Sequence, residues 1–271
     1  MATPVRRPVA SLWIGPRLHY LNQLCLLSHV RQGHPTTLYC VGEVANVPEG
    51  VEVRPASEIM EISPELMRQI APAPISDMFR CKMIAATDAI WIDCDAYCRA
   101  PFPDEMTHIF GTHGFRGALA NGVMYIPPRG ALMEALLDYF ENLPETPEWF
   151  NKQQRKKLER QDPALPRAVR ILNVERTAFG PQAFTHFAQA TGDYAKALTP
   201  DYLYPVPFQL NDVFYDPYGR VEGHFTENTI SVHLYTNGTK PWWRRNPPLK
   251  DSYVWRMCRE LGVDPSQALE E

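Results

Sequence analysis

The sequence has no long apolar run and no strong excess of one charge. No window reaches the roughly 18 apolar residues that a membrane-spanning helix needs, and the two arginines near the N-terminus are not followed by the apolar core of a signal peptide. Lys and Arg number 27 against 31 Asp and Glu, so the net charge of −4 gives no general attraction to nucleic acid. We therefore expect a cytoplasmic protein that has no transmembrane segment and no nucleic-acid partner.

Cysteine is sparse and follows no recognisable pattern. The six cysteines form no Cys-x-x-Cys pair and no zinc-finger spacing, so we expect them to be reduced and to pack as small apolar side chains. Internal repeats and low-complexity tracts are also lacking, and 45% hydrophobic residues in a chain of 271 are enough for a full core. We expect a single domain over residues 1–271.

The hydrophobic pattern predicts alternating strands and helices. An apolar strand over 9–15 is followed by a helix that starts near Pro16 and by a β-branched strand over 36–41, which is the order of a parallel sheet. Further strands are expected at 51–54, 89–95, 115–119, 123–126 and 229–235, with helices opening at Ser63-Pro64 and near 76–87, 130–141, 181–191 and 251–261. The fold class is therefore α/β, with a mixed, mainly parallel sheet flanked by helices.

Residues 142–176 depart from this rhythm. Prolines surround a basic helix over 151–160, which indicates a helical insertion, and residues 246–271 are expected to carry a C-terminal helix. The basic helix suits two roles that the sequence leaves open. It is either a solvated face or a peripheral contact with anionic lipid headgroups.

Asp93 and Asp95 are the sharpest chemical feature. They come at the end of an apolar strand, where residues two apart share a side, and open α/β sheets bind ligands at the carboxyl ends of their strands. Two hard oxygen donors favour Mg²⁺ or Mn²⁺, ions that complete their shells with water and substrate phosphates. The pattern therefore favours a nucleotide ligand. A surface loop with two aspartates is the alternative.

Asp77 and Arg80 lie one helical turn apart on the preceding helix. The simplest interpretation is an ion pair within that helix. If the helix packs beside the strand, Asp77 can accept hydrogen bonds from hydroxyls and Arg80 can donate to phosphate or sugar oxygens. That division of roles suits a sugar nucleotide.

The stretch SDMFRCKMIAATDAIWIDCD, residues 76–95, resembles the donor-binding segment of glycosyltransferases of the GT-A fold, in particular family 32. Relatives of that family include bacterial polysaccharide and lipooligosaccharide glycosyltransferases and the catalytic domains of clostridial glucosylating toxins. Asp77, Arg80, Trp91, Asp93 and Asp95 fall at the spacing of the family pattern. Asp88-Ala89 departs from it, because the family commonly has two glycines before the strand.

The resemblance extends to both ends of the chain. Trp13-Ile14-Gly15 resembles a first-strand element whose Trp stacks on uracil, and residues 231–242 are similar to a closing motif in which His233 is the third metal ligand. In that motif Lys240 and Trp242 lie over the diphosphate. Asn121 matches a position that faces the transferred sugar.

The resemblance implies a metal-dependent, retaining glycosyltransferase of polysaccharide biosynthesis. A hexose would pass from a nucleotide sugar, with UDP favoured, to a glycan or lipid-linked acceptor. The implied metal ligands are Asp93, Asp95 and His233, with Arg80 and Lys240 assisting catalysis and Trp13, Asp77, Arg80, Trp91, Asn121, Lys240 and Trp242 binding the donor. Inversion would instead need a carboxylate base, for which Asp212 and Asp216 are the candidates.

Two other functions remain open from the residues. Phosphatases of the haloacid dehalogenase type also place Asp-x-Asp after an apolar strand and use the first Asp as a nucleophile. A protein of the same fold that binds sugar nucleotides or glycans without turnover is the second alternative.

Overall fold

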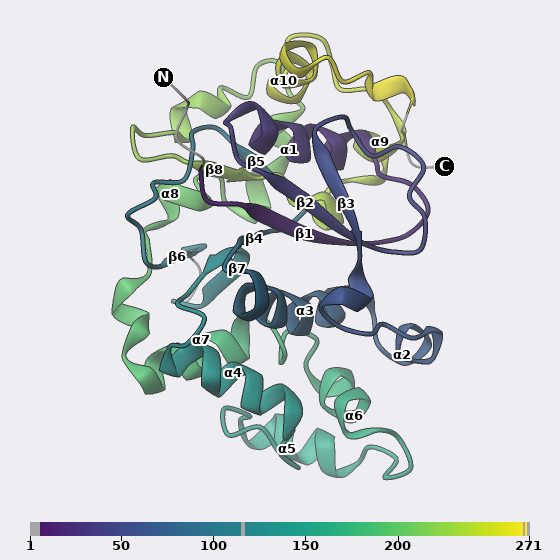
Figure 1. The fold of residues 1–271 in the computed structure, drawn as a ribbon, viewed down its shortest axis with the longest axis vertical. Coiled ribbons are helices and arrows are strands. Elements are labelled where there is room, and N and C mark those ends of the chain that lie inside the picture. Colours follow the sequence, from purple (N-terminus) through teal and green to yellow (C-terminus); the bar gives the residue numbers. More distant parts are fainter. Residues whose placement is uncertain (1–5, 115–116, 268, 270–271) are drawn as a thin grey trace.

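The protein is described by a computed structural model that covers residues 6–114, 117–267 and 269. Its centre is a six-stranded sheet in the order β3-β2-β1-β4-β7-β6 (Figure 1). The strands are β1 (Val9–Ile14), β2 (Thr36–Val41), β3 (Val51–Pro55), β4 (Ile90–Ile92), β6 (Ile109–Thr112) and β7 (Leu119–Tyr125). The pairs β3-β2, β2-β1 and β1-β4 are parallel, and β7 is antiparallel to both its neighbours. The predicted mixed, mainly parallel sheet is confirmed.

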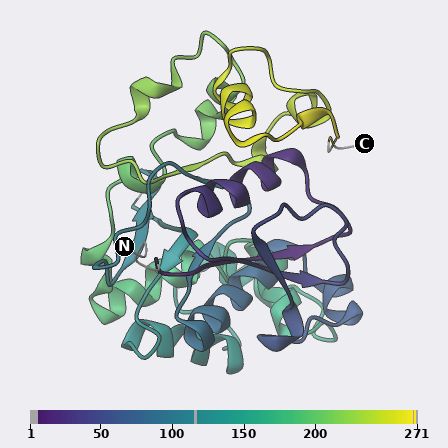
Figure 2. The ribbon, with the colours of Figure 1, turned by 45° about the horizontal axis from the view of Figure 1, so that its top comes forward.

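Helices cover both faces of this sheet. One face carries α1 (Tyr20–Arg31), which packs on α10 (Tyr253–Leu261), and the other carries α3 (Pro72–Thr87), α4 (Ala131–Glu141) and α7 (Pro181–Thr191) (Figures 1 and 2). A small second sheet joins β5 (Ala96–Cys98) to β8 (Ser231–His233) beside α1. The shorter helices are α2 (Pro64–Gln69), α5 (Lys152–Glu159), α6 (Arg167–Val174), α8 (Pro200–Leu203) and α9 (Pro241–Arg245). None of the described helices has both the length and the apolar character needed to cross a bilayer.

The first helix begins later than predicted. The expectation that Pro16 lies in its first turn is wrong, because α1 starts at Tyr20 and His19 is its N-cap. The amide of Leu18 donates to Asn46 Oδ1 at 2.7 Å, which holds this stretch as a loop along the carboxyl end of β1. The loop matters for function, because Arg17 and His19 point from it into the cleft described below.

Strands of the antiparallel edge also differ from the prediction. The strand expected over 115–119 includes two residues outside the described part of the chain. The observed strand β7 runs from Leu119 to Tyr125, so the strand expected over 123–126 is the second half of this longer strand. The sequence missed β6, whose pairing with β7 is interrupted by a bulge at Gly111. A short, bulged strand that contains glycine carries no clear two-residue alternation.

The core is dense and includes every cysteine. Large side chains of the sheet and of α3, such as Phe79, Trp91 and Phe110, are fully buried between the layers. The six cysteines are buried and unpaired, as expected for small apolar side chains in a reduced protein.

Candidate active site

Backbone pairing brings the two aspartates and the distant histidine together. Asp93 directly follows β4, and Asp95 directly precedes β5. In the ladder of β5 with β8, His233 lies opposite Ala96, and the amide of Leu234 donates to the carbonyl of Asp95 at 2.8 Å. Two antiparallel strands therefore fix His233 next to Asp95, although the two residues are far apart in the sequence.

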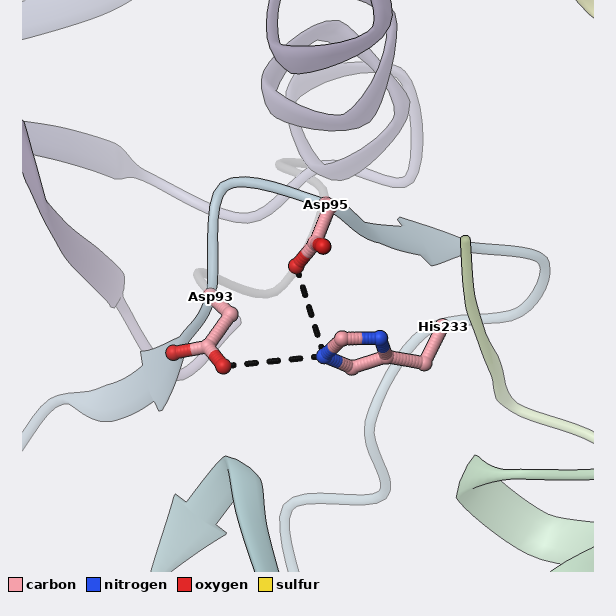
Figure 3. A group of neighbouring side chains, drawn as sticks. All are labelled: Asp93, Asp95 and His233. Carbon is pink, nitrogen blue, oxygen red and sulfur yellow. Dashed lines mark ion pairs between the residues drawn. The ribbon is translucent and has the colours of Figure 1, made fainter. Parts of the chain in front are cut away.

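The three side chains converge on one point (Figure 3). His233 Nε2 lies 3.5 Å from Asp93 Oδ2 and 3.3 Å from Asp95 Oδ1. One ligand atom from each residue lies within 4.8 Å of the others. Two ligands bound at right angles, each about 2.1 Å from an octahedral ion, lie about 3 Å apart. The residue types and spacing therefore fit a small divalent cation, and this convergence is the one predicted from the sequence.

Gly122 leaves the space that this cluster occupies. A β-carbon at Gly122 would lie 2.7 Å from His233 Nε2 and 2.9 Å from Asp93 Oδ2, closer than such contacts occur in proteins. The amide of Asp93 also donates to the Gly122 carbonyl at 2.6 Å. Only glycine at 122 allows β7 to pass this close to the ligands, which is a role the sequence did not reveal.

Electrostatics favour charged carboxylates beside the imidazole. Burial would lower the pKa of His233, but the Asp95 and Asp93 carboxylates outweigh burial and raise that pKa above its ordinary value. The amide of Tyr235 donates to His233 Nδ1 at 3.2 Å. His233 Nε2 would coordinate a cation with the ring proton on Nδ1, and in that tautomer Nδ1 would no longer accept from the Tyr235 amide.

Arg80 links α3 to Asp93, the aspartate that follows β4. Its Nη2 lies 3.2 Å from Asp77 Oδ1 and 3.4 Å from Asp93 Oδ1. Nη1 donates to the Asn121 carbonyl and Nε donates to the Ser76 carbonyl at 3.2 Å. Burial opposes ionisation of Asp93, but Arg80 and His233 together lower the pKa of its carboxyl. The predicted ion pair with Asp77 is present, and most donors of this buried guanidinium already have protein acceptors.

Asp77 and Asn121 hold each other behind Arg80. Asn121 Nδ2 donates to Asp77 Oδ1 at 2.9 Å, and both side chains are buried. A β-carbon at Gly180 would lie 2.5 Å from Asp77 Oδ2, so α7 begins in contact with this carboxylate. Burial raises the pKa of Asp77, and Arg80 and Asn121 partly oppose that change.

Trp91 and Trp13, two of the three tryptophans predicted to bind the donor, differ in exposure. Trp91 is 1% exposed and donates from Nε1 to Asp93 Oδ1 at 2.8 Å, so it orients a candidate ligand from within the core. Trp13 is half-buried at the end of β1 and lines the cleft. Its buried Nε1 has no hydrogen-bond partner within the described part of the chain.

A cleft of about 560 Å³ opens above the three candidate ligands. Its walls come from the end of β1, the loop before α1, the first turns of α3, residue 208 and residues 235–244. They include Trp13, Arg17, His19, Ser76, Phe208, Tyr235, Thr236 and Arg244. Arg17, His19, Thr236 and Arg244 are not among the site residues predicted from the sequence. Arg17 follows directly on the carboxyl end of β1, which is a signal that could have identified it.

Thr236 completes the fixation of Asp95. Its amide and its hydroxyl donate to Asp95 Oδ2 at 2.8 and 3.0 Å. Oδ1 of Asp95 therefore faces His233 while Oδ2 is held by protein donors.

Lys240 and Trp242 lie outside the cleft wall of the described residues. Lys240 Nζ pairs with Asp212, whose other oxygen accepts from Trp243 Nε1 at 3.1 Å. Trp242 is half exposed and lies edge-on to Trp243. Pro241 starts α9 immediately after Lys240, and Arg244 of this helix reaches the cleft wall whereas Lys240 and Trp242 do not. The contacts with a diphosphate that the resemblance implies for these two side chains stay predictions.

Comparison with known proteins gives short or distant similarities. No family model matches the chain. Over 73 residues it is 33% identical to "Subversion of eukaryotic traffic protein A" of Legionella pneumophila, a match that covers 25% of this chain and only 11% of that protein.

Two solved glycosyltransferase structures are also similar to this chain. The first is "PaToxG Glycosyltransferase", with 13% identity, 69% of each chain covered and a TM-score of 0.41. The second is the bifunctional glycosyltransferase WbbM, with 12% identity, 96% of this chain and 50% of that chain covered and a TM-score of 0.43.

Proposed function

We propose that this protein is a divalent-metal-dependent glycosyltransferase that transfers a hexose from a nucleotide sugar to a glycan or lipid-linked acceptor. One observation carries the proposal: Asp93, Asp95 and His233 converge within 4.8 Å at the carboxyl end of the parallel strands. The adjoining cleft of about 560 Å³ is of the size that small-molecule sites in proteins have. Mg²⁺ or Mn²⁺ bound there would neutralise the charge that develops on a departing nucleoside diphosphate.

The residues of the site divide into ligands and supports. Arg80 and Trp91 fix Asp93, and Thr236 fixes Asp95, so the carboxylates need little rearrangement on binding a cation. Trp13 lines the cleft and offers an indole face on which a nucleobase can stack, and UDP is the favoured nucleotide through the family resemblance. Arg17 supplies a cationic donor in the same cleft. Retention of the anomeric configuration belongs to the proposal through the family resemblance.

The phosphatase alternative fits the site less well. A nucleophilic aspartate needs a free oxygen directed at the phosphorus atom. Asp93 Oδ1 accepts from Trp91 and lies next to Arg80, and Oδ2 faces His233. Oδ1 is therefore held by protein donors, and Oδ2 is the oxygen that the proposed cation would take, which leaves neither for attack on phosphorus. A non-catalytic sugar-nucleotide binder would use the same cleft and differs only in turnover.

A donor hydrolysis assay tests the proposal. The protein is incubated with UDP-, GDP- and ADP-linked hexoses in Mn²⁺ or in EDTA, and release of the nucleoside diphosphate is measured alongside hydrolysis of p-nitrophenyl phosphate. We expect Mn²⁺-dependent release of one nucleoside diphosphate and no hydrolysis of the monoester. Monoester hydrolysis would establish the phosphatase. Metal-linked binding without turnover of any donor, also with added glycan acceptors, would establish the binder.

A further inference from the structure

The helix α5 is built as an independent, well-capped element on the surface. The Asn151 side chain accepts from the amides of Gln153 and Gln154 at 2.9 and 3.0 Å, and Gln154 Oε1 accepts from the amide of Asn151 at 2.9 Å. This reciprocal capping fixes where the helix starts. Within α5 only Leu158 is buried. The helix is therefore attached to the protein through one side.

The opposite side of α5 is mainly cationic, with one acidic side chain, the exposed Glu159, at its edge about 20° from Lys152. At about 100° per residue, Lys152, Lys156 and Arg160 fall within about 80° of one another, and Lys157 lies about 60° further round. Leu158 lies opposite the centre of this arc. All four cationic side chains are exposed, and we call them the α5 basic face.

These four cations have no partner within the described residues, whereas their neighbours do. Arg155 of the same helix donates to the carbonyls of Phe150 and Glu148, both at 2.7 Å. Arg167 of α6 pairs with Glu145. The local acceptors are thus used by arginines that hold the segment together. No ion pair or side-chain hydrogen bond in the described part of the chain involves the α5 basic face.

The surrounding charge distribution is strongly asymmetric. Residues 142–176 carry eight Lys and Arg and five Asp and Glu, a net charge of +3. The rest of the chain carries 19 basic and 26 acidic residues, a net charge of −7. In Figure 1 α5 lies at the lower end of the molecule, opposite α10. An anionic surface would therefore attract this end and repel the remainder, which gives the protein one preferred orientation.

We propose that the α5 basic face docks the protein on a bilayer that contains anionic phospholipid. The occupant follows from charge complementarity: four unpaired cations on one side of a helix match a layer of phosphate groups, and each cation near such a surface strengthens binding about fivefold. The face carries no aromatic side chain on which a base could stack. It is also a short convex helix side rather than a groove, which favours a bilayer over a nucleic acid.

Docking through this face is electrostatic and reversible. No apolar side chain lies on the cationic arc, so nothing inserts into the acyl layer. The interaction is independent of the proposed transferase activity, because no residue of the α5 basic face lines the cleft.

Vesicle co-sedimentation with the full chain tests this proposal. Vesicles of phosphatidylcholine alone are compared with vesicles that contain phosphatidylserine and phosphatidylcholine. The test variant is the triple substitution Lys152→Gln, Lys156→Gln and Arg160→Gln. The control is Arg31→Gln, Arg129→Gln and Lys250→Gln, which removes the same charge from exposed positions elsewhere. Thermal unfolding of both variants checks that they fold.

We expect binding only to the phosphatidylserine vesicles. The triple substitution on α5 should weaken it about a hundredfold, against less than threefold for the control variant. Raising the ionic strength from about 0.1 M to about 0.5 M should release the protein, because the screening length falls to about 4 Å. Equal binding to both vesicle types, or equal loss in both variants, would overturn the proposal. Tighter binding of a duplex RNA that the α5 substitutions abolish would assign the face to nucleic acid instead.

Discussion

Arg80 Nη2 lies 3.4 Å from Asp93 Oδ1, so a helix residue fixes the first candidate metal ligand. The same guanidinium lies above the ring of Trp91 at 4.8 Å, and Trp91 itself donates to Asp93. Asp93 is therefore oriented by two core residues that act on the same oxygen. This leaves Oδ2 directed at His233 and at the proposed cation.

Arg80→Met should destabilise the fold and weaken metal binding together. It leaves the buried Asp77 carboxylate without its cation, and breaking a buried ion pair in this way costs about 3 kcal/mol or more. We expect the free energy of unfolding in urea to fall by that amount. Mn²⁺ affinity, measured by calorimetry, should fall at least tenfold because Asp93 loses its orientation.

Asp77→Asn in the Arg80→Met background is the matched test. Removing the unpaired carboxylate should recover part of the lost stability without restoring Mn²⁺ affinity. If Arg80→Met left stability unchanged and lowered only donor affinity, Arg80 would be a donor contact rather than a support for Asp93.

Gly122→Ala should abolish metal binding while the sheet still forms. The added β-carbon would lie 2.7 Å from His233 Nε2, so either the ligands or β7 must move. We expect no Mn²⁺ binding by calorimetry and a circular dichroism spectrum like that of the unaltered protein. Gly223→Ala is the control, because a β-carbon there meets nothing within 4 Å. Normal Mn²⁺ binding by the Gly122→Ala variant would contradict the proposed position of the cation.

Asp95→Asn and His233→Ala should each remove the Mn²⁺-dependent stabilisation of the folded protein by UDP, the nucleotide part of the proposed donor. A ligand that binds only the folded state raises the melting temperature with its concentration, so UDP with Mn²⁺ should raise it in the unaltered protein. We expect no such increase in either variant, and none in the unaltered protein after EDTA treatment. Asp216→Asn, an exposed change outside the cleft, should behave like the unaltered protein. A normal increase in both site variants would eliminate the proposed metal site.

His29 should make the fold sensitive to acid. Burial lowers the pKa of this histidine from about 6.5 to about 3, and its Nε2 donates to the Ala96 carbonyl at 3.0 Å. At pH values between these two pKa values, His29 binds a proton in the unfolded chain but not in the folded protein. The stability contributed by neutral His29 is therefore fully present above about pH 6.5 and is lost as the pH falls. The loss from this group is about 2 to 3 kcal/mol between pH 6.5 and pH 4.5.

Urea unfolding at a series of pH values measures this effect. His29→Gln should remove up to about 1.4 kcal/mol per pH unit from the slope in that interval. His224→Gln, on a partly exposed histidine, should leave the slope unchanged. An identical slope in His29→Gln and the unaltered protein would mean that His29 is protonated in the folded state.

The sequence predicted the parts of this molecule that depend on local pattern. A strand followed by Asp93 and Asp95 is visible because apolar runs and residue spacing are local, and the sheet class follows from the order of elements. His233 entered through resemblance, and only the pairing of β5 with β8 brings it to Asp95.

Tertiary packing decided what the sequence did not show. The contact between Arg80 and Asp93 requires α3 to lie beside β4. The spacing of Asp77 and Arg80 within one helix predicts their ion pair but not the contact with Asp93. The roles of Gly122 and Gly180 depend on how closely a neighbouring side chain approaches the backbone, for which one sequence has no signal. The start of α1 was misplaced because the amide of Leu18 donates to a distant asparagine, Asn46, which keeps Leu18 out of the helix.

The ladder between β5 and β8 also sets the order in which the molecule can mature during synthesis. All six strands of the main sheet have been synthesised once Tyr125 has been made, but the third candidate ligand is at His233. A nascent chain can therefore contain every strand of the main sheet and still lack the third candidate ligand. Acquisition of cation binding would report that translation has passed β8.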